Sequence, residues 1–288
     1  MKDLNYQLMK LCRQNRDGGY STQATRSRIL DLVANQLHGL GYARMQATSL
    51  KPKHIEALVG LWSRQGIKIG TLKNRLAALR WWAGKVNKAN VVARDNTAYG
   101  IGARTFVAEH SKAQALDTVK LERIEDKYVR LSVRLQAAFG LRREEAIKFN
   151  PGYAIRGDHI ALKSTWTKGG RARTVPITNS EQRRLLQDVK AFCKGGSLIP
   201  AHLNYIQQQH RYDRQTRKVG MKNLHGLRHG YAQTRYRDLT GFPCPAAGGP
   251  TSKELTPAQR ALDQQARATI SRELGHGREA ITAVYLGR

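Results

Sequence analysis

The chain has 288 residues, with 50 lysines and arginines against 21 aspartates and glutamates, so its formal net charge at pH 7 is +29. Hydrophobic residues make up 40% of the sequence, which is enough for a packed core and excludes a chain that is disordered because it is too polar. A folded protein with this charge attracts phosphate backbones and releases counterions on binding, so nucleic acid is the expected partner and an anionic membrane surface the weaker alternative.

The first third of the chain predicts a small, basic bundle of helices. Apolar residues recur at helical spacing over three segments, 21–40, 54–62 and 71–86. The last segment carries three basic side chains among its polar positions, and we expect them to contact nucleic acid: Lys73, Arg75 and Arg80.

The helical pattern weakens between residue 87 and about residue 116, where glycines and scattered polar residues predict a linker. We therefore expect an N-terminal extension over residues 1–20, a helical domain over 21–110 and a second domain over 111–288. The net charge is +12 over residues 1–110 and +17 over the rest, so both parts are expected to contact the polyanion.

The second domain predicts helices around one short antiparallel pair of strands. Two β-like runs, 159–162 and 173–177, are separated by Lys168-Gly169-Gly170-Arg171, which is a hairpin signal. Helical spacing is found over 128–139, 142–149, 180–192, 203–219, 224–237, 266–274 and 278–285. Residues 241–256 are rich in proline and glycine and predict a loop.

The sequence gives no support for a membrane-spanning segment, a signal peptide or a zinc site. No apolar run approaches the roughly 20 residues that span a bilayer, and the first 16 residues lack the apolar core of a signal peptide. Three cysteines, Cys12, Cys193 and Cys244, are far apart and odd in number, so we expect reduced thiols rather than a zinc site. A cytoplasmic protein is expected.

Two basic clusters could hold phosphate. Arg142 follows Gly140-Leu141 where a turn opens a helix, so its guanidinium and the backbone N–H groups could bind an anion together. Lys168 lies at the hairpin tip, with Arg171 and Arg173 beside it, where it could reach a nucleic-acid groove. Each cluster alone is a weak signal, because solvated arginines and flexible basic turns are common.

Two further clusters could carry proton transfer and nucleophilic attack. His225 and Arg228 are three residues apart and share one side of a helix, a pairing that suits phosphoryl transfer. His229 faces elsewhere and is interpreted as a core histidine. His276 follows Leu-Gly, and nine residues later comes Tyr285, whose hydroxyl could act as a nucleophile beside cations.

Read together and in order, these clusters resemble the tyrosine recombinase, or phage-type integrase, family. The family's Gly-Leu-Arg-x-x-Glu motif matches Gly140 to Glu145, and its hairpin lysine matches Lys168. Its His-x-Leu-Arg-His motif matches His225 to His229, and its Leu-Gly-His and terminal tyrosine match Leu274 to His276 and Tyr285. The segment Gly70 to Arg80 also resembles the family's core-binding domain, so the resemblance covers nearly the whole chain.

The resemblance implies a mainly α fold with two domains. These are an N-terminal all-α, SAM-like core-binding domain that clamps DNA, and an α+β catalytic domain of the DNA breaking–rejoining fold with a small antiparallel sheet. It also implies a site-specific recombinase that integrates or excises a mobile element, acting as a homotetramer on duplex DNA attachment sites, with a DNA-bending accessory protein as a possible helper.

The resemblance also implies a role for each matched residue. Tyr285 would attack the scissile phosphate and leave a 3′-phosphotyrosine, while Arg142 and Arg228 would hold the non-bridging oxygens. Lys168 would protonate the leaving 5′-oxygen. His225 would assist proton transfer at the tyrosine.

Two residues complete the implied set without taking part in covalent bond formation or proton transfer. His276 would hydrogen-bond the phosphate, and Glu145 would orient the arginine region. The ester keeps the bond energy, so the family chemistry needs no ATP, metal or other cofactor, and the sequence contains no nucleotide-binding glycine loop.

The sequence departs from the family pattern in two places. Arg228 and His276 are 48 residues apart, about twice the usual interval, and we interpret residues 237–265 as an insertion near a protein or DNA face. Only three residues follow Tyr285, where many relatives continue into an element that docks on a neighbouring subunit. The insertion or residues 1–20 could replace that contact.

Other functions remain open at this stage. A relaxing enzyme of the type IB topoisomerase kind and a telomere resolvase would share the chemistry. A DNA-binding regulator or architectural protein could have kept the fold and lost cleavage, although all six catalytic positions are filled. A basic RNA-associated protein is a third reading, which predicts tighter binding to RNA than to duplex DNA.

Overall fold

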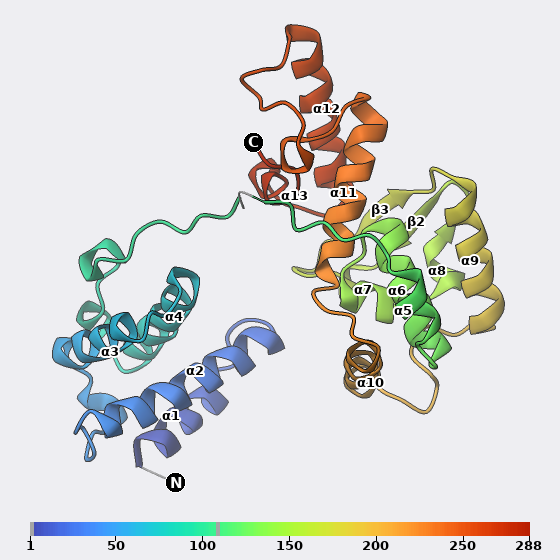
Figure 1. Ribbon diagram of the computed structural model, residues 1–288. Helices are drawn as coiled ribbons and strands as arrows, with labels where there is room; N and C mark the ends of the chain where they lie inside the picture. The colour runs from blue at the N-terminus through green and yellow to red at the C-terminus, as the bar shows by residue number, and fades with distance from the viewer. Residues whose placement is uncertain (1–2, 108–109) are drawn as a thin grey trace. The chain divides into compact units, whose positions relative to one another are not determined.

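The computed structural model describes residues 3–107 and 110–288, and the chain divides into two compact units, Met1–Thr105 and Phe106–Arg288 (Figure 1). The predicted mainly helical fold with one small antiparallel sheet is confirmed. Within the described residues, no helix has the length and apolar character needed to cross a membrane.

The first unit is a bundle of helices with short 3₁₀ turns between them. Its helices are α1 (Asp3–Gln14), α2 (Tyr20–Gly39), α3 (Pro52–Arg64) and α4 (Ile69–Lys85). The 3₁₀ turns are η1 (Ala47–Ser49), η2 (Ala89–Val91) and η3 (Thr97–Tyr99). The three helices predicted from apolar spacing are present as α2, α3 and α4.

Two tryptophans fix the centre of this bundle. Trp62 of α3 and Trp82 of α4 are fully buried in one apolar cluster. The indole N–H of Trp62 donates to Oε1 of Gln36 at 2.8 Å, and that of Trp82 donates to the carbonyl of Ala47 at 2.9 Å. Each large ring therefore brings apolar area into the core without leaving its polar atom unpaired.

Helix α1 was not predicted from the sequence. It packs against α2, with Leu4 and Leu8 buried in the same cluster as the two tryptophans. Asn5 is also buried and donates to Oδ1 of Asp31 on α2 at 2.7 Å. These contacts make α1 part of the helical unit.

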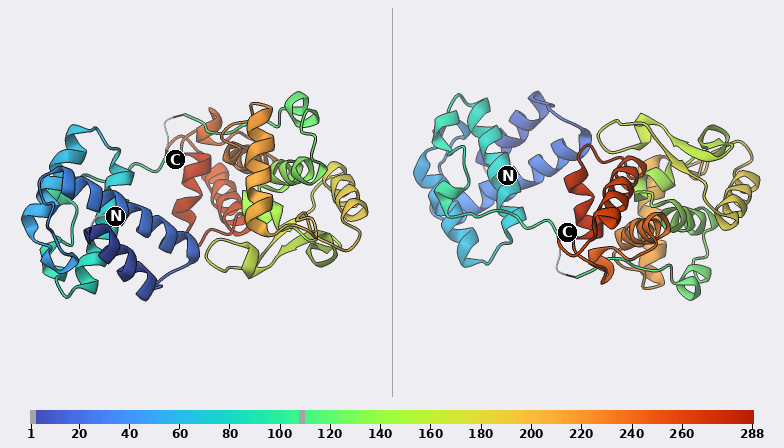
Figure 2. Two further views of the ribbon diagram at one scale, coloured as in Figure 1. Left: turned by 90° about the horizontal axis from the view of Figure 1, so that it is seen from below. Right: turned by 90° about the horizontal axis from the view of Figure 1, so that it is seen from above.

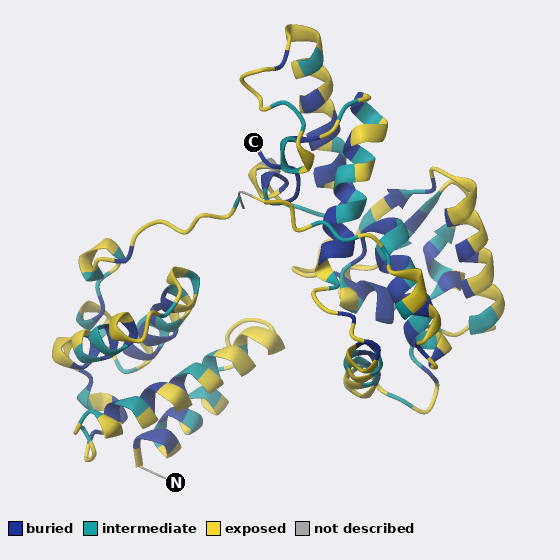
Figure 3. Cartoon of the chain, in the orientation of Figure 1, coloured by how far each residue is buried: buried dark blue, intermediate teal, exposed yellow. Residues whose placement is uncertain are grey.

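The second unit places helices around a three-stranded sheet. Helices α5 (Thr118–Glu122), α6 (Lys127–Phe139), α7 (Arg143–Ile147) and α8 (Pro151–Ala154) precede the sheet or lead into it. After it come α9 (Ser180–Cys193), α10 (Tyr205–Lys218), α11 (His225–Thr240), η5 (Pro245–Ala247), α12 (Pro257–Glu273), η6 (Glu279–Ile281) and α13 (Ala283–Leu286). Figure 3 shows that buried residues gather around α6 and α11, while the outer face of α9 is exposed.

The sheet contains the predicted hairpin and one strand more. Its order is β1 (Ile155–Arg156), β2 (His159–Leu162) and β3 (Arg173–Pro176), all antiparallel. Residues 163–172 join β2 to β3 as a long loop with its own 3₁₀ turn, η4 (Ser164–Trp166). Within this loop residues 167–170 form a tight turn, in which the Gly170 N–H donates to the carbonyl of Thr167 at 3.2 Å, and Lys168 lies in that turn.

Helix α12 begins nine residues earlier than the sequence pattern indicated. Its start is fixed by a capping box in which Thr256 and Gln259 exchange side-chain and backbone hydrogen bonds, followed by Pro257 at the first helical position. α12 packs alongside α11, and α13 packs against the half of α11 that begins at His225 (Figures 1 and 2). This arrangement brings residues 283–286 beside the first turns of α11.

Candidate active site

Tyr285 lies on α13 with 6% of its surface exposed, and its hydroxyl faces two side chains of α11. Nε2 of His225 lies 3.2 Å from the hydroxyl oxygen, and Nε of Arg228 donates to it at 3.4 Å. The one-turn spacing of His225 and Arg228 puts both on the same side of α11. The expected nucleophile and two of its expected partners are thus brought together.

The neighbouring helices hold the end of the chain in place. Gln233 of α11 donates to the carbonyl of Tyr285 at 3.0 Å, and Nη1 of Arg267 on α12 donates to the carbonyl of Gly287 at 2.9 Å. Nε of Arg267 donates to Asp263 at 2.7 Å, and Asp263 also accepts from the hydroxyl of Tyr236 at 2.6 Å. Asp263 lies inside the segment interpreted as an insertion, so part of that segment supports α13.

Two imidazole rings pack close to the ring of Tyr285. The ring of His276 stacks on it at 5.1 Å with an interplanar angle of 27°, and the ring of His229 lies at 4.3 Å and 32°. His229 is buried, as interpreted from the sequence, but it belongs to the surroundings of Tyr285 rather than to a remote part of the core. Nδ1 of His276 lies 3.1 Å from the hydroxyl of Thr282.

Arg228 is a buried cation, with 1% of its surface exposed. Its Nη1 donates to the carbonyl of Gly140 and its Nη2 to the carbonyl of Leu274, so the guanidinium joins the turn before α7 to the end of α12. Nη2 also lies 3.5 Å from Nε2 of His276. Burial, and secondarily the charge of Arg142, lowers the pKa of Arg228 to about 10, which leaves it protonated at neutral pH.

Glu145 is the buried acid of the site, and two arginines bind it. Arg142 donates to it twice, from its backbone N–H at 2.7 Å and from Nη1 at 2.9 Å. Arg173 of β3 binds the same carboxylate with both terminal nitrogens, at 2.8 and 2.7 Å. Burial alone would raise the pKa of Glu145, but the hydrogen bonds and charge of Arg173, with the charges of Arg228 and Arg142, hold it at about 2.

The structure gives Arg173 different surroundings from the nucleic-acid contact predicted for it. Only 5% of its side chain is exposed, and its guanidinium is directed to Glu145 and to the carbonyl of Glu273, which accepts from Nε at 2.8 Å. Arg171 is exposed on the same loop, as expected for a contact residue. The two hairpin arginines therefore differ in what they contact.

The three histidines of the site are held in their neutral form. Burial, together with the charges of Arg228 and Arg142, lowers the pKa of His276 to about 3 and also lowers the pKa of His225. Burial and the neighbouring His225 lower the pKa of His229 to about 4. At neutral pH the imidazoles can accept or donate a hydrogen bond without adding to the positive charge of the arginines.

Lys168 is exposed on the loop between β2 and β3. Its charge contributes to the lowered pKa of His225, after burial and the two arginines. The structure therefore brings five of the six expected catalytic residues together: Arg142, His225, Arg228, His276 and Tyr285. Lys168 lies on a loop close enough for its charge to lower the pKa of His225.

The basic residues predicted on α4 are partly engaged inside the first unit. Arg80 donates from Nε to the carbonyl of Ala93 at 2.8 Å and from Nη2 to Asn96 at 2.9 Å, which ties the segment after α4 back to the helix. The guanidinium of Arg75 lies over the ring of Trp62 at 5.1 Å, and burial lowers its pKa. Lys73 is half-buried.

Sequence reasoning missed a second buried network beside the site. Glu273, at the end of α12, accepts from the hydroxyl of Tyr231 at 2.8 Å and from Arg235 at 3.0 and 3.1 Å. Nothing in the local sequence distinguishes these residues from ordinary polar positions on two helices.

Among the described residues, no group of three or more histidines, cysteines and acids is placed to hold a metal ion.

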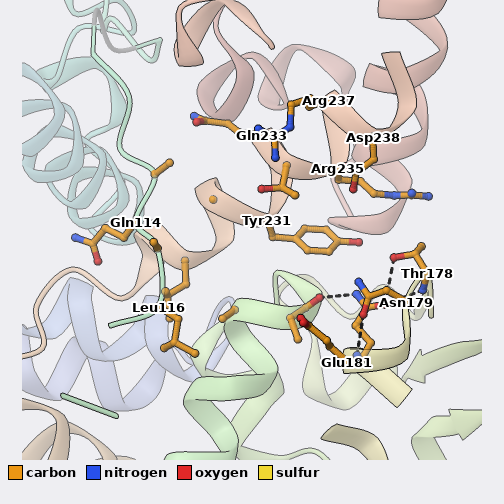
Figure 4. A pocket seen from close by; sticks show the side chains of 18 of the residues that line it. Gln114, Leu116, Thr178, Asn179, Glu181, Tyr231, Gln233, Arg235, Arg237 and Asp238 are labelled. Carbon is orange, nitrogen blue, oxygen red and sulfur yellow. Dashed lines mark hydrogen bonds between the residues drawn. The ribbon is translucent and has the colours of Figure 1, made fainter. Parts of the chain in front are cut away.

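A pocket of about 680 Å³ lies on another side of α11 and contains none of the six expected catalytic residues. It is lined by residues 113–116, by side chains of α6, by the start of α9, and by residues on and after α11, and the ring of Tyr231 reaches into it (Figure 4). The candidate chemistry therefore lies outside this pocket.

Both parts of the chain match family models of integrases. The family model for the phage integrase N-terminal domain matches residues 1–89, and the integrase model matches residues 97–234. His276 and Tyr285 lie beyond the matched residues. A search of curated proteins found no match.

Solved structures with the same fold include three DNA complexes. A lambda integrase dimer bound to a COC′ core site matches 99% of this chain and 78% of its own, at 14% identity and a TM-score of 0.64. The Tn1549 transposon integrase in complex with circular intermediate DNA matches 100% and 96%, at 14% identity and a TM-score of 0.58. The XerH recombinase bound to a palindromic difH substrate matches 99% and 81%, at 16% identity and a TM-score of 0.58.

At these identities the solved structures support the fold alone. The two family models together cover most of the chain, and they do so in the order in which the two units follow one another. The chain belongs to the phage integrase family of tyrosine recombinases.

Proposed function

We propose that this chain cuts and rejoins duplex DNA at specific sites, with Tyr285 as the nucleophile. The observation that carries the proposal is the position of the Tyr285 hydroxyl, 3.2 Å from a neutral histidine, His225, and 3.4 Å from a buried arginine, Arg228. A hydroxyl between a proton acceptor and a fixed cation is the arrangement that nucleophilic attack on a phosphodiester requires.

The phosphate would bind between the two arginines. Nη1 and Nη2 of Arg228 each donate to a backbone carbonyl, of Gly140 and of Leu274, while Nε faces Tyr285 and Nη2 also lies beside His276. Arg142 adds a second guanidinium, close enough for its charge to lower the pKa of Arg228. Arg173 binds the Glu145 carboxylate with two nitrogens and so balances its negative charge. The carboxylate therefore does not cancel the positive charge that Arg142 and Arg228 offer to the phosphate.

The chemical step follows from these positions. The oxygen of Tyr285 forms a bond to phosphorus as the bond to the 5′-oxygen breaks, and His225 accepts the tyrosine proton. Lys168 gives a proton to the departing 5′-oxygen, which leaves as a hydroxyl. If the Thr282 hydroxyl donates to Nδ1 of His276, Nε2 carries a proton that it can offer to the phosphate.

The reverse of this step joins strands. A 5′-hydroxyl from another strand attacks the phosphotyrosine, and the tyrosine takes back its proton, so the number of phosphodiester bonds is conserved. The residues of this chain supply the acid, the base and the positive charge for both directions.

We further propose that the protein acts as a homotetramer on two duplex attachment sites of a mobile element, with both units in contact with the DNA. The lambda integrase tetramer bound to a Holliday junction and the transposon integrase on circular intermediate DNA support this, since both share the fold. Residues 237–265 and a DNA-bending accessory protein are candidates for organising that assembly.

The test is capture of covalently bound DNA. Purified protein is incubated with sheared host DNA and denatured in SDS, and the DNA that stays attached is sequenced. We expect enrichment of one imperfect inverted repeat, lost in Tyr285→Phe while DNA affinity is kept, because only a hydroxyl is removed. No adduct on this DNA or on nicked suicide substrates, with binding intact, would instead identify a regulator that has lost cleavage.

A further inference from the structure

The loop that carries Lys168 is flanked by two buried side chains, those of Trp166 and Arg173. On one side Trp166 is buried in the core around the sheet, with its ring 5.5 Å from that of Tyr153. The hydroxyl of Thr167 donates to the carbonyl of Arg171 at 2.7 Å and closes the tip of the loop. On the other side, Arg173 enters the protein. Lys168 itself is exposed between these fixed points.

Arg173 joins three segments that are distant in the sequence. It belongs to β3, it binds Glu145 of α7 through two nitrogens, and its Nε donates to the carbonyl of Glu273 at the end of α12. The next residue after Glu273 is Leu274, whose carbonyl accepts from Arg228. The Arg173 side chain therefore connects the Lys168 loop to two supports. One is the backbone at the end of α12, which binds Arg228, and the other is the carboxylate of Glu145, which binds Arg142.

The loop also fits closely against the turn that carries His276. Gly275 has a φ of +65°, and a β-carbon there would lie 2.8 Å from Cδ of Arg173. A β-carbon at Gly277 would lie 2.3 Å from a terminal nitrogen of Arg171. Both glycines leave room for the hairpin arginines, so the lysine loop and the His276 turn form one packed unit.

We propose that Arg173 is a positioning residue that sets the general acid: its three hydrogen bonds fix the β2–β3 loop so that Lys168 is held over the leaving 5′-oxygen. The proposal rests on the proposed function. It replaces the DNA contact expected of Arg173 with an internal role, in agreement with a side chain that is 5% exposed.

The geometry favours action on Lys168 over a general effect on the site. Arg142 keeps two contacts with Glu145 that do not involve Arg173, and Arg228 is held by two carbonyls of its own. Among the described hydrogen bonds, residues 163–172 have one to α7 or α12, from Lys148 to the carbonyl of Thr165, and Arg171 adds a packing contact at Gly277. Loss of Arg173 is therefore expected to release the lysine before it disturbs the arginines.

A sulfur leaving group tests this assignment. DNA of the sequence recovered by covalent capture is made as a nicked suicide substrate with oxygen or with sulfur at the bridging 5′ position. A thiolate leaves without a proton, so sulfur removes the need for a general acid. We expect Lys168→Met and Arg173→Met to cleave the oxygen substrate about 10²-fold or more slowly than the wild type and the sulfur substrate within about tenfold of it.

Two further variants define the outcomes. Arg142→Met should stay slow on both substrates, because sulfur does not replace a phosphate contact. Arg173→Lys keeps the charge but has only one nitrogen, and should be intermediate on oxygen and close to the wild type on sulfur. If Arg173→Met is equally slow on the sulfur substrate, Arg173 acts through the phosphate contacts or the fold, and the proposal is overturned.

A second measurement does not depend on DNA. Hydrogen exchange of the full chain should become faster over residues 163–172 and 274–278 in Arg173→Met, and stay unchanged in α6 and α11. The matched control is Arg184→Met, an exposed arginine on α9, which should change neither segment. Unchanged exchange in the loop of Arg173→Met would overturn the proposal. If the wild type forms no covalent adduct while Arg173→Met still exchanges faster in both segments, the proposed function fails and only the fixing of the loop by Arg173 stands.

Discussion

The hydroxyl of Tyr285 lies 3.2 Å from Nε2 of His225, although the two residues are 60 positions apart in the sequence. A single chain therefore brings its own tyrosine to its own histidine and arginine. This follows from α13 being bound to both α11 and α12 through the carbonyls of Tyr285 and Gly287.

Replacement of the His225 imidazole tests its role as proton acceptor. We expect His225→Gln to slow covalent adduct formation by about 10²-fold or more, since general base catalysis contributes about 10²–10⁴-fold. DNA affinity, measured by fluorescence anisotropy at fixed salt, should stay within about twofold. Equal losses of affinity and cleavage would show that His225 serves binding instead.

Acid should destabilise the second unit through its neutral histidines. His276 has a pKa of about 3 and His229 of about 4, both below the ordinary value of 6.5. Between those values and pH 6.5 the unfolded chain binds protons that the folded chain does not. The free energy of unfolding is therefore highest, as far as these histidines contribute, above pH 6.5, and it decreases as the pH drops.

The control for this effect is His276→Gln. Urea denaturation at pH 7.5, 6.5, 5.5 and 4.5 should show a shallower dependence in the variant, by up to one proton, or about 1.4 kcal/mol per pH unit. Identical slopes in the variant and the wild type would show that His276 is not held neutral by its surroundings.

The buried carboxylate should matter far more than its exposed neighbour. Glu145→Gln leaves the guanidinium of Arg173 buried without its anion, and we expect it to lower the free energy of unfolding by about 3–5 kcal/mol. Glu144→Gln removes a partly exposed contact with Lys148 and should cost about 0–1 kcal/mol. Chemical denaturation of the two variants side by side gives the comparison, and similar losses would contradict the account.

Support of the tyrosine from α12 can be tested at a distance from the reaction. Asp263→Asn weakens the contact that orients Arg267 toward the carbonyl of Gly287. A displacement of Tyr285 by about 1 Å can slow the reaction about 10²-fold. Adduct formation should fall accordingly with DNA affinity unchanged, and the exposed Asp238→Asn on α11 should behave like the wild type.

Much of this arrangement could be predicted from the sequence because its signals are local. Apolar spacing marks α2, α3 and α4, and the strand–turn–strand pattern marks the hairpin. The candidate residues stand in short motifs whose order can be read along the chain. Helix α1 escaped prediction because its few apolar residues form a stable helix only by packing on α2.

The interactions that hold the site together could not be predicted. Arg173 and Glu145 are 28 residues apart, and nothing around Arg173 distinguishes an inward-facing arginine from one at a hairpin surface. The same applies to Glu273, 42 residues from Tyr231, and to Asp263, 27 residues from Tyr236. Such pairs are set by how the helices pack, which a single sequence does not encode locally.

We expect cleavage to leave Tyr285 covalently attached to DNA. The direct measurement is mass spectrometry of the captured adduct after nuclease and trypsin digestion, with attention to the C-terminal peptide of residues 279–288. We expect this peptide to carry a nucleotide through a 3′-phosphate on Tyr285. A nucleotide attached to any other residue, or an adduct of equal yield from Tyr285→Phe, would contradict the account.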